Sequence, residues 1–232
     1  MSTNIKNTPI FITGAERSGS SIIARIVNHC GVFSGKITDM QENKKIKDLL
    51  DKYYVYNLHI SPLGQYPLPN SLKIKVPEDW RITVLQSLQM ELYNERIPWF
   101  YKSGRLAQTW PIWNHEFPLA KWIIVRRRTG DIIQSCMKTG WMIAFDNTYT
   151  LEKLGVSTIQ EGWLWWVHQH EKMFIEMIEA GLNYREIWPE RMATGDFEQV
   201  KEIIQWLDLE WKEDIPELVK PLFKNSSQKK GV

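Results

Sequence analysis

The stretch PIFITGAERSGSS, residues 9–21, constrains the fold more than any other part of the sequence. Ile10–Thr13 is typical of a short buried strand, and a loop of glycine and serine leads from it into an amphipathic helix over Ser20–Cys30. A strand that turns directly into a helix is typical of open α/β sheets, which bind ligands at the carboxyl ends of their strands. We therefore expect a ligand-binding turn between this strand and this helix.

Three further apolar runs bounded by turn residues predict parallel strands at Trp99–Lys102, Trp122–Val125 and Tyr184–Ile187. A long helix is expected near 157–180, starting with Ser157 and Gln160 at capping-box spacing, and a last helix opens at Asp196. Strands that alternate with helices predict an α/β fold, a three-layer open parallel sheet with helices on both faces. The irregular stretch 57–76 is expected to be a long loop.

Composition limits the class of protein. The 232 residues, 43% hydrophobic, suit a single domain over 1–232 with a substrate-side insertion at 31–98. The 29 basic and 27 acidic residues argue against nucleic-acid binding through bulk charge. Cys30 and Cys136 lie in apolar helical contexts, which predicts buried free thiols. We find no apolar run of the roughly 18 residues that a transmembrane helix needs, so we expect a cytoplasmic protein.

The loop over residues 14–21 contains the kinds of group that can form a cradle of donors around an anion. Gly14 and Gly19 have the spacing of a Walker A loop, but Ser20 stands where that loop has the lysine that reaches the β- and γ-phosphates of ATP. The other donors remain: Arg17, the backbone N–H groups at the helix start, and the hydroxyls of Ser18, Ser20 and Ser21. The loop therefore predicts a phosphate or sulfate site, and the alternative is a turn without a ligand.

A second motif, KWIIVRRRTGDIIQS over 121–135, places basic residues at the end of another strand. Arg127 follows that strand, and Ser135 lies on the helix that starts near Thr129, so both can reach one anion. Asp131, in the first turn, can cap the turn or orient the arginine. The alternative is a solvated basic corner.

These two motifs resemble the nucleotide site of the PAPS-dependent sulfotransferases, which use 3′-phosphoadenosine 5′-phosphosulfate (PAPS) as donor. Arg17 and the run Ser18, Gly19, Ser20 and Ser21 match the family's 5′-phosphosulfate loop, and Arg127 and Ser135 match its 3′-phosphate motif. Thr129 stands where the family usually has proline. The resemblance covers about residues 9–30 and 99–210. It implies a P-loop NTPase-like sulfotransferase fold, PAPS as donor, PAP as product and no metal.

The resemblance also suggests catalytic residues. Lys102, in WFYKSGRL, matches a lysine near the transferring sulfuryl group, and the alternative is a solvent-exposed lysine at a strand end. Gly104 stands where the cytosolic branch has a histidine base. Other branches take a carboxylate just after the first helix, which here is Glu42 in preference to Asp39, unless Glu42 is only a solvated acid. His59 is a further candidate base.

Two other ionisable residues are expected outside the chemistry. We expect Glu16 to point away from the loop or to pair with an arginine, because a free carboxylate there would repel the donor. His170 falls on the apolar stripe of the long helix, and its spacing from His168 does not suit a shared metal, so a core histidine is expected.

The sequence thus predicts transfer of a sulfuryl group from PAPS to a hydroxyl or amine of a small-molecule or glycan acceptor, with Arg17, Lys102 and Glu42 as catalytic residues. The alternatives are a non-catalytic nucleotide-binding module and a P-loop kinase-like phosphotransferase. The acceptor and the oligomeric state cannot be inferred from these residues. The terminal Lys229, Lys230 and Gly231 resemble a basic segment that contacts the 3′-phosphate in some members, and a disordered tail is the alternative.

Overall fold

The chain forms an open sheet of four parallel strands in the computed structural model, which describes residues 8–56, 78–140 and 142–228. The spatial order is β2 (Phe100–Lys102), β1 (Ile10–Thr13), β3 (Lys121–Val125) and β4 (Tyr184–Ile187). In this register Ile12 pairs with Lys102 on one side and with Ile123 on the other. The predicted α/β class and all four strands are confirmed, with β2 starting one residue later and β3 one residue earlier than expected.

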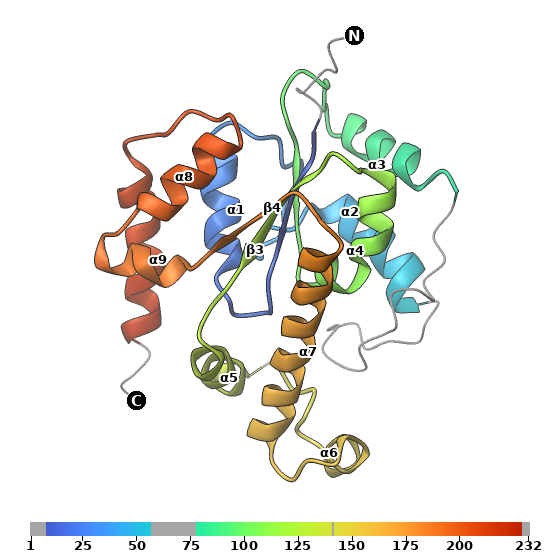
Figure 1. The fold of residues 1–232 in the computed structure, drawn as a ribbon, viewed down its shortest axis with the longest axis vertical. Helices are drawn as coiled ribbons and strands as arrows, with labels where there is room; N and C mark the ends of the chain where they lie inside the picture. The colour runs from blue at the N-terminus through green and yellow to red at the C-terminus, as the bar shows by residue number, and fades with distance from the viewer. Residues whose placement is uncertain (1–7, 57–77, 141, 229–232) are drawn as a thin grey trace.

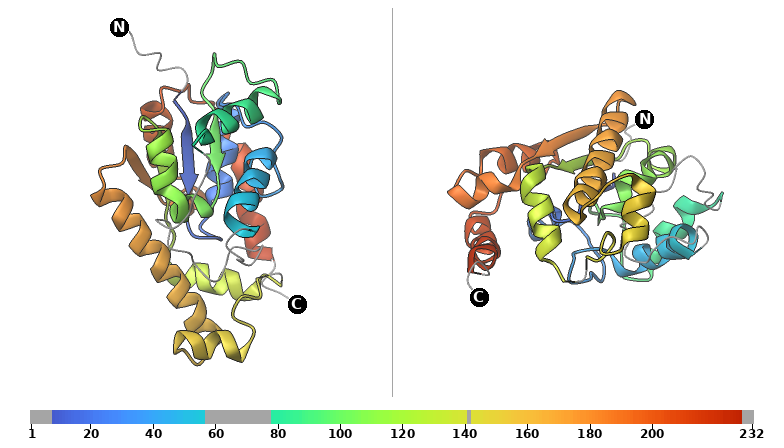
Figure 2. Two further views of the ribbon diagram at one scale, coloured as in Figure 1. Left: turned by 90° about the vertical axis from the view of Figure 1, so that its right-hand side faces the viewer. Right: turned by 90° about the horizontal axis from the view of Figure 1, so that it is seen from below.

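The two faces of the sheet are covered by different helices (Figures 1 and 2). Ile10 and Ile12 point to the face packed by α1 (Ser20–His29), α8 (Glu198–Trp206) and α9 (Ile215–Gln228). Phe11 points to the opposite face, packed by α2 (Lys44–Leu50), α3 (Trp80–Gln89), α4 (Arg105–Glu116) and α7 (Ile159–Glu179). Because side chains alternate along a strand, both faces are apolar, and the three layers follow.

Aromatic rings fill the second face. Phe11 lies 4.8 Å from Trp122 and 5.0 Å from Trp113 between ring centroids, and Trp113 lies 5.5 Å from Trp80. These tryptophans are fully buried, and so is Trp99. Edge-to-face and tilted contacts of this kind stabilise a core beyond the area they bury. These four tryptophans therefore build the core rather than line a ligand site.

A third apolar cluster joins α5 (Thr129–Lys138), α6 (Thr148–Leu154) and α7, which project beyond the carboxyl ends of the strands (Figure 1). The start of α7 differs from the prediction. Thr158, not Ser157, caps the helix, and its hydroxyl accepts from Glu161 N while the Glu161 carboxylate accepts from the backbone N–H groups of Ser157 and Thr158. Cys136 packs in this cluster, and both cysteines are buried and free, as expected.

The carboxyl-terminal part contains a helix that the sequence did not predict. After η4, a short 3-10 helix over Pro189–Thr194, α8 begins at Glu198 rather than at Asp196 and is not the last helix. Helix α9 follows, and its Ile215 and Val219 are buried in the core beside α1. Helix α9 extends to Gln228, and residues 229–231, for which a disordered tail was the alternative, lie outside the described residues.

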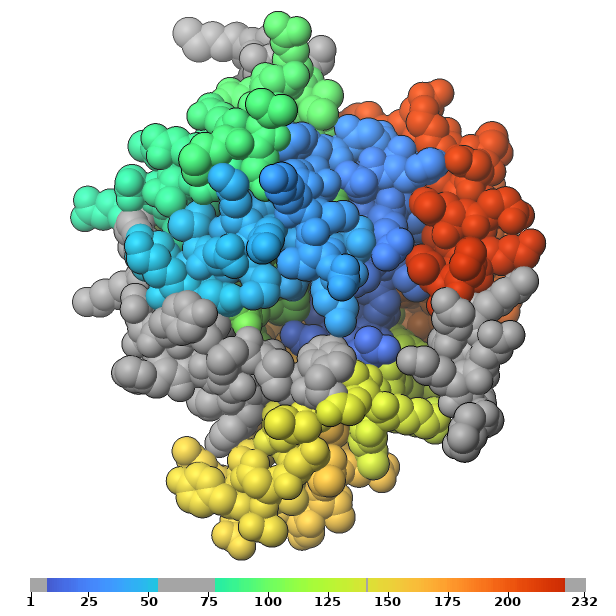
Figure 3. Space-filling view, turned by 180° about the vertical axis from the view of Figure 1, so that it is seen from behind, coloured from blue at the N-terminus to red at the C-terminus, as the bar shows by residue number. Residues whose placement is uncertain are grey.

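Residues 31–56 run beside α1, with α8 and α9 on one side and the α6–α7 pair projecting below (Figure 3). This segment contains α2 and a π-helical turn, η2 (Asp51–Tyr56). The expected loop 57–76 lies outside the described residues, and the division of the chain into one domain with an insertion stays a prediction. Among the helices that the structure describes, none has both the length and the apolar character to span a membrane.

Candidate active site

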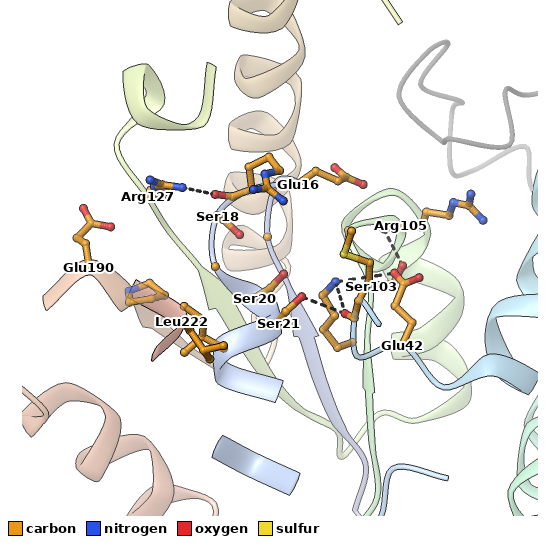
Figure 4. A pocket seen from close by; sticks show the side chains of 18 of the residues that line it. Glu16, Ser18, Ser20, Ser21, Glu42, Ser103, Arg105, Arg127, Glu190 and Leu222 are labelled. Carbon is orange, nitrogen blue, oxygen red and sulfur yellow. Dashed lines mark hydrogen bonds and ion pairs between the residues drawn. The ribbon is translucent and has the colours of Figure 1, made fainter. Parts of the chain in front are cut away.

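A cavity of about 530 Å³ opens at the carboxyl ends of the strands, within the usual range for small-molecule sites (Figure 4). The loop between β1 and α1 forms one wall, the end of β2 and the start of α4 another, and η4 with α9 a third. Of the residues predicted for the site, Ser135 alone is not among those that line this cavity. Predicted residues as far apart in the sequence as Arg17 and Arg127 therefore meet at the carboxyl ends of the strands.

Close packing shapes the loop itself. A Cβ on Gly14 would lie 2.6 Å from the carbonyl oxygen of Val125, so a glycine is required for the loop to pass β3. Gly19 has a φ of 98° and Arg17 a φ of 69°, both in the left-handed region. This conformation suits glycine but is costly for arginine, and such strain is typical of functional loops.

The start of α1 presents donors without a local partner. No described side chain caps this end of the helix, and its first turn holds no acidic residue. Ser18 is 1% exposed, and its buried hydroxyl has no hydrogen-bond partner among the described residues. The helix dipole adds about half a positive charge there. These donors fit an anionic group in the cavity.

The two predicted anion-binding motifs are joined by hydrogen bonds. Arg17 Nε donates to Ser135 Oγ at 2.9 Å, and the Arg127 guanidinium donates to the backbone carbonyl of Arg17 at 2.8 Å. Both guanidinium groups therefore lie within reach of a single ligand, as the sequence motifs require. Asp131 is exposed in the first turn of α5.

The three consecutive arginines have different surroundings. Arg126 pairs with Glu171 at 2.6 Å and with Glu186 at 3.5 Å. Arg128 has a side chain that is 78% exposed and lies 3.7 Å from Glu190. Of the three, only Arg127 is among the described residues that line the cavity.

Lys102 is buried in the cavity wall, so the alternative of a solvent-exposed lysine is wrong. Lys102 is 7% exposed, and its Nζ donates to the carbonyl oxygen of Met40 at 3.1 Å. The Ser21 hydroxyl donates to the same oxygen at 3.0 Å, which ties the segment before α2 to the cradle. Burial lowers the pKa of the Lys102 ammonium, and the nearby Glu42 and Glu16 oppose this shift.

Glu42 is held next to Lys102. Its backbone N–H donates to the Thr38 hydroxyl at 3.2 Å, and its carboxylate lies 4.0 Å from Lys102 Nζ. The Glu42 side chain is only 18% exposed, so it is not a fully solvated acid. Asp39 is exposed and does not line the cavity, and His59 lies outside the described residues.

The expectation for Glu16 is wrong. Glu16 lines the cavity instead of pointing away from it, and no described arginine pairs with it. Its carboxyl end points toward the side of the cavity where Ser103 and Arg105 lie, away from Arg127 (Figure 4). Burial raises its pKa to about 7, because the charged form loses its hydration.

Sequence reasoning missed Arg105, Glu190, Leu222 and Phe223, which also line the cavity. Arg105 is buried at the start of α4 and forms an ion pair with Asp51 of η2. Arg105 lies three residues after Lys102, the last residue of β2. A basic residue just past the end of a predicted strand is the sequence signal that could have identified it. The residues of α9 carry no such signal, because only the tertiary packing brings that helix to the cavity.

The fold and the cavity define a class of protein. A four-stranded parallel sheet, a glycine-containing loop that opens a helix, and arginines just after the carboxyl ends of two strands together define an open α/β fold with a candidate anion-binding cavity. Ser20 stands where a Walker A loop has its lysine.

A family model described as "Sulfotransferase family" matches residues 9–213, most of the chain. The protein belongs to the sulfotransferase family. A search of curated protein sequences found no significant match. The shared fold and family agree with the resemblance noted in the two anion motifs.

Solved structures show the same fold at low sequence identity. Sulfotransferase STF9 from Mycobacterium avium is 12% identical with a TM-score of 0.54, over 94% of this chain and 68% of that chain. Sulfotransferase STF1 from Mycobacterium tuberculosis H37Rv is 12% identical with a TM-score of 0.51, over 91% and 70%. The sulfotransferase domain of the Synechococcus PCC 7002 olefin synthase is 18% identical with a TM-score of 0.53, over 90% and 77%.

Proposed function

We propose that this protein transfers a sulfuryl group from PAPS to a hydroxyl or amine of a small-molecule or glycan acceptor. The observation that carries this proposal is the link between the two anion motifs, in which Arg127 donates to the Arg17 carbonyl and Arg17 to Ser135, beside one cavity. A donor with phosphate groups at two ends of one adenosine requires two such cationic groups close together.

The residues present fit an anionic donor. At the start of α1, which no described side chain caps, the cradle of Ser18, Gly19, Ser20 and Ser21 offers backbone donors and the Ser18 hydroxyl, which has no partner among the described residues. Arg17 adds a planar cation. Arg127 and Ser135 would hold the 3′-phosphate on the neighbouring strand and helix. PAP, the product, would keep both sets of contacts.

Catalysis in this site would rest on charge stabilisation and in-line positioning. Arg17 and the loop amides would stabilise the negative charge that develops on the leaving 5′-phosphate. Lys102, whose ammonium pKa is lowered by burial, would neutralise the sulfuryl oxygens, and their negative charge would in turn favour its charged form. Glu42, which the sequence alone suggests as a proton acceptor, has its carboxylate 4.0 Å from Lys102 Nζ and would help to hold that lysine.

Calorimetry and transfer assays test this function. We expect tight binding of PAP without magnesium, and turnover of radiolabelled PAPS with at least one member of a panel of phenols, alcohols, sugars and amines. PAP binding without turnover across the panel would favour the non-catalytic nucleotide-binding module, which Gly104 in the histidine position suggests. Magnesium-dependent binding of ATP in place of PAP would contradict the proposal and favour a kinase-like phosphotransferase.

The acceptor class follows from the same proposal. Apolar side chains of α9, such as Leu222, also line the cavity together with charged groups, so a partly apolar molecule with a hydroxyl or amine fits it. The cytoplasmic location expected from the sequence stays a prediction.

A further inference from the structure

A buried carboxyl group in the cavity wall has no partner that explains it. Glu16 Oε2 is buried and makes no hydrogen bond to the described part of the chain. The charged or titratable groups that act on it are Lys102 at the end of β2, Arg105 at the start of α4, Glu42 before α2 and the Cys136 thiol on α5. Since burial of an unpartnered carboxyl is costly, its persistence at a cavity indicates a use.

Gly104 provides the room for this carboxyl. A Cβ on Gly104 would lie 2.6 Å from Glu16 Oε1 and 2.9 Å from Glu16 Cδ, closer than nonbonded atoms approach. Glycine at 104 therefore lets the Glu16 carboxyl lie against the start of α4. Because residue 104 is glycine, it has no side chain that could accept a proton. The space that a side chain there would fill is occupied by the Glu16 carboxyl instead.

The surroundings make this carboxyl a proton acceptor near neutral pH. Burial raises the pKa of Glu16 to about 7, and Glu42 adds to the shift, while its own backbone N–H, Lys102 and Arg105 oppose it. A general base works best when its pKa lies near the working pH. At pH 7 to 8 a large share of Glu16 is ionised and able to accept a proton.

We propose that Glu16 is the catalytic base of the sulfuryl transfer, an inference that rests on the function proposed above. The acceptor O–H or N–H gives its proton to the Glu16 carboxylate, and the acceptor atom forms a bond to sulfur. The bond between sulfur and the bridging phosphate oxygen breaks, and its electron pair stays on the 5′-phosphate of PAP. Glu16 then releases the proton to solvent, and Glu42 acts as a positioning residue for Lys102.

One test needs no acceptor. PAP brings negative charge next to Glu16, which raises its pKa further, so binding at pH 7.5 should add about half a proton to the protein. Calorimetry of PAP in buffers with different heats of ionisation measures this uptake. Relative to the wild type, Glu16→Gln should lose the uptake while its affinity for PAP stays the same or increases, and Glu42→Gln should keep it.

A second test measures catalysis, with radiolabelled PAPS and either para-nitrophenol or water as acceptor. Glu16→Gln should lower kcat by about 100- to 10,000-fold without raising KM for PAPS, and should abolish the rise of kcat/KM through pH 7. Glu42→Gln should retain that rise. Gly104→Ala should displace the carboxyl and also lower kcat, whereas Gly140→Ala, at an exposed turn with open space around it, should match the wild type.

The outcomes separate the two proposals. PAP binding with an unchanged pH profile in Glu16→Gln, or with equal proton uptake in both proteins, would overturn the base assignment alone. PAP binding with proton uptake but no consumption of PAPS with any acceptor would contradict both proposals, because neither the transfer nor its base would then operate. Failure to bind PAP would overturn the proposed function itself.

Discussion

Two substitutions at Arg17 separate the contribution of its guanidinium group to ligand binding from the free-energy cost of its left-handed backbone conformation. Arg17 has a φ of 69°, which costs an L-residue about 1–2 kcal/mol relative to glycine. Its Nε also donates to Ser135 Oγ at 2.9 Å on the exposed side of the cavity. Arg17→Ala removes the side chain but keeps the backbone cost, whereas Arg17→Gly removes both.

Both variants should lose PAP affinity, because a charge-assisted contact of this kind contributes about 1.5–3 kcal/mol. That loss corresponds to a rise in Kd of about 10- to 150-fold by calorimetry. Urea unfolding without ligand should show Arg17→Gly to be about 1 kcal/mol more stable than Arg17→Ala, after the larger freedom of glycine in the unfolded chain is subtracted.

Arg25→Ala is the matched control, since Arg25 is exposed on α1 and does not line the cavity. It removes the same charge from the same region and should change the Kd of PAP by less than about twofold, because solvent and salt screen its field. Wild-type affinity in Arg17→Ala would refute the cradle. Lower stability of Arg17→Gly than of Arg17→Ala would refute the backbone argument.

Three further predictions follow from particular residues. Arg127→Ala should remove the preference for PAP over AMP in calorimetry, and a retained preference would place the 3′-phosphate elsewhere. Trp113→Ala should destabilise the fold by about 3–5 kcal/mol in urea unfolding, because the side chain is fully buried among aromatic rings, whereas Tyr149→Ala, 71% exposed, should cost about 0.5 kcal/mol or less. Burial lowers the pKa of His170 to about 4 from 6.5, so the unfolded chain binds more protons between these values and stability falls as pH falls through them. Unfolding at pH 7.5, 6 and 5 should show a smaller acid loss in His170→Phe; an equal loss would contradict this.

The strand–turn–helix units were readable from the sequence because the contacts that form them are local. Ile10–Thr13 is mostly apolar and rich in β-branched residues, and Gly14 and Gly19 permit the turn that starts α1. The same reasoning gave β3 and the start of α5 at Thr129. The cap of α7 was misplaced by one residue, because Ser157 and Thr158 both suit that role and only the reach of Glu161 decides between them.

Contacts between distant segments were beyond such reasoning. Helix α9 has prolines at 216 and 221 and a polar end, so its sequence resembles a tail, and it is held by burial of Ile215 and Val219 beside α1. Electrostatics alone placed Glu16 away from the loop. The prediction failed because the sequence does not show that Gly104 lies next to Glu16. The absence of a side chain at Gly104 leaves a space into which the Glu16 carboxyl fits.

The sequence by itself determined the fold class, the turn between β1 and α1 that carries the candidate anion-binding residues, and the likeness of Arg127 and Ser135 to a second phosphate site. Only the tertiary structure decided that Arg17 meets Ser135, 118 residues away, and that Lys102 is buried beside two carboxyl groups. The physical reason is that the carboxyl ends of parallel strands meet at one edge of the sheet, and the packing of the helices between them decides which strands become neighbours. Which side chains then share a cavity depends on that packing, which no local pattern encodes.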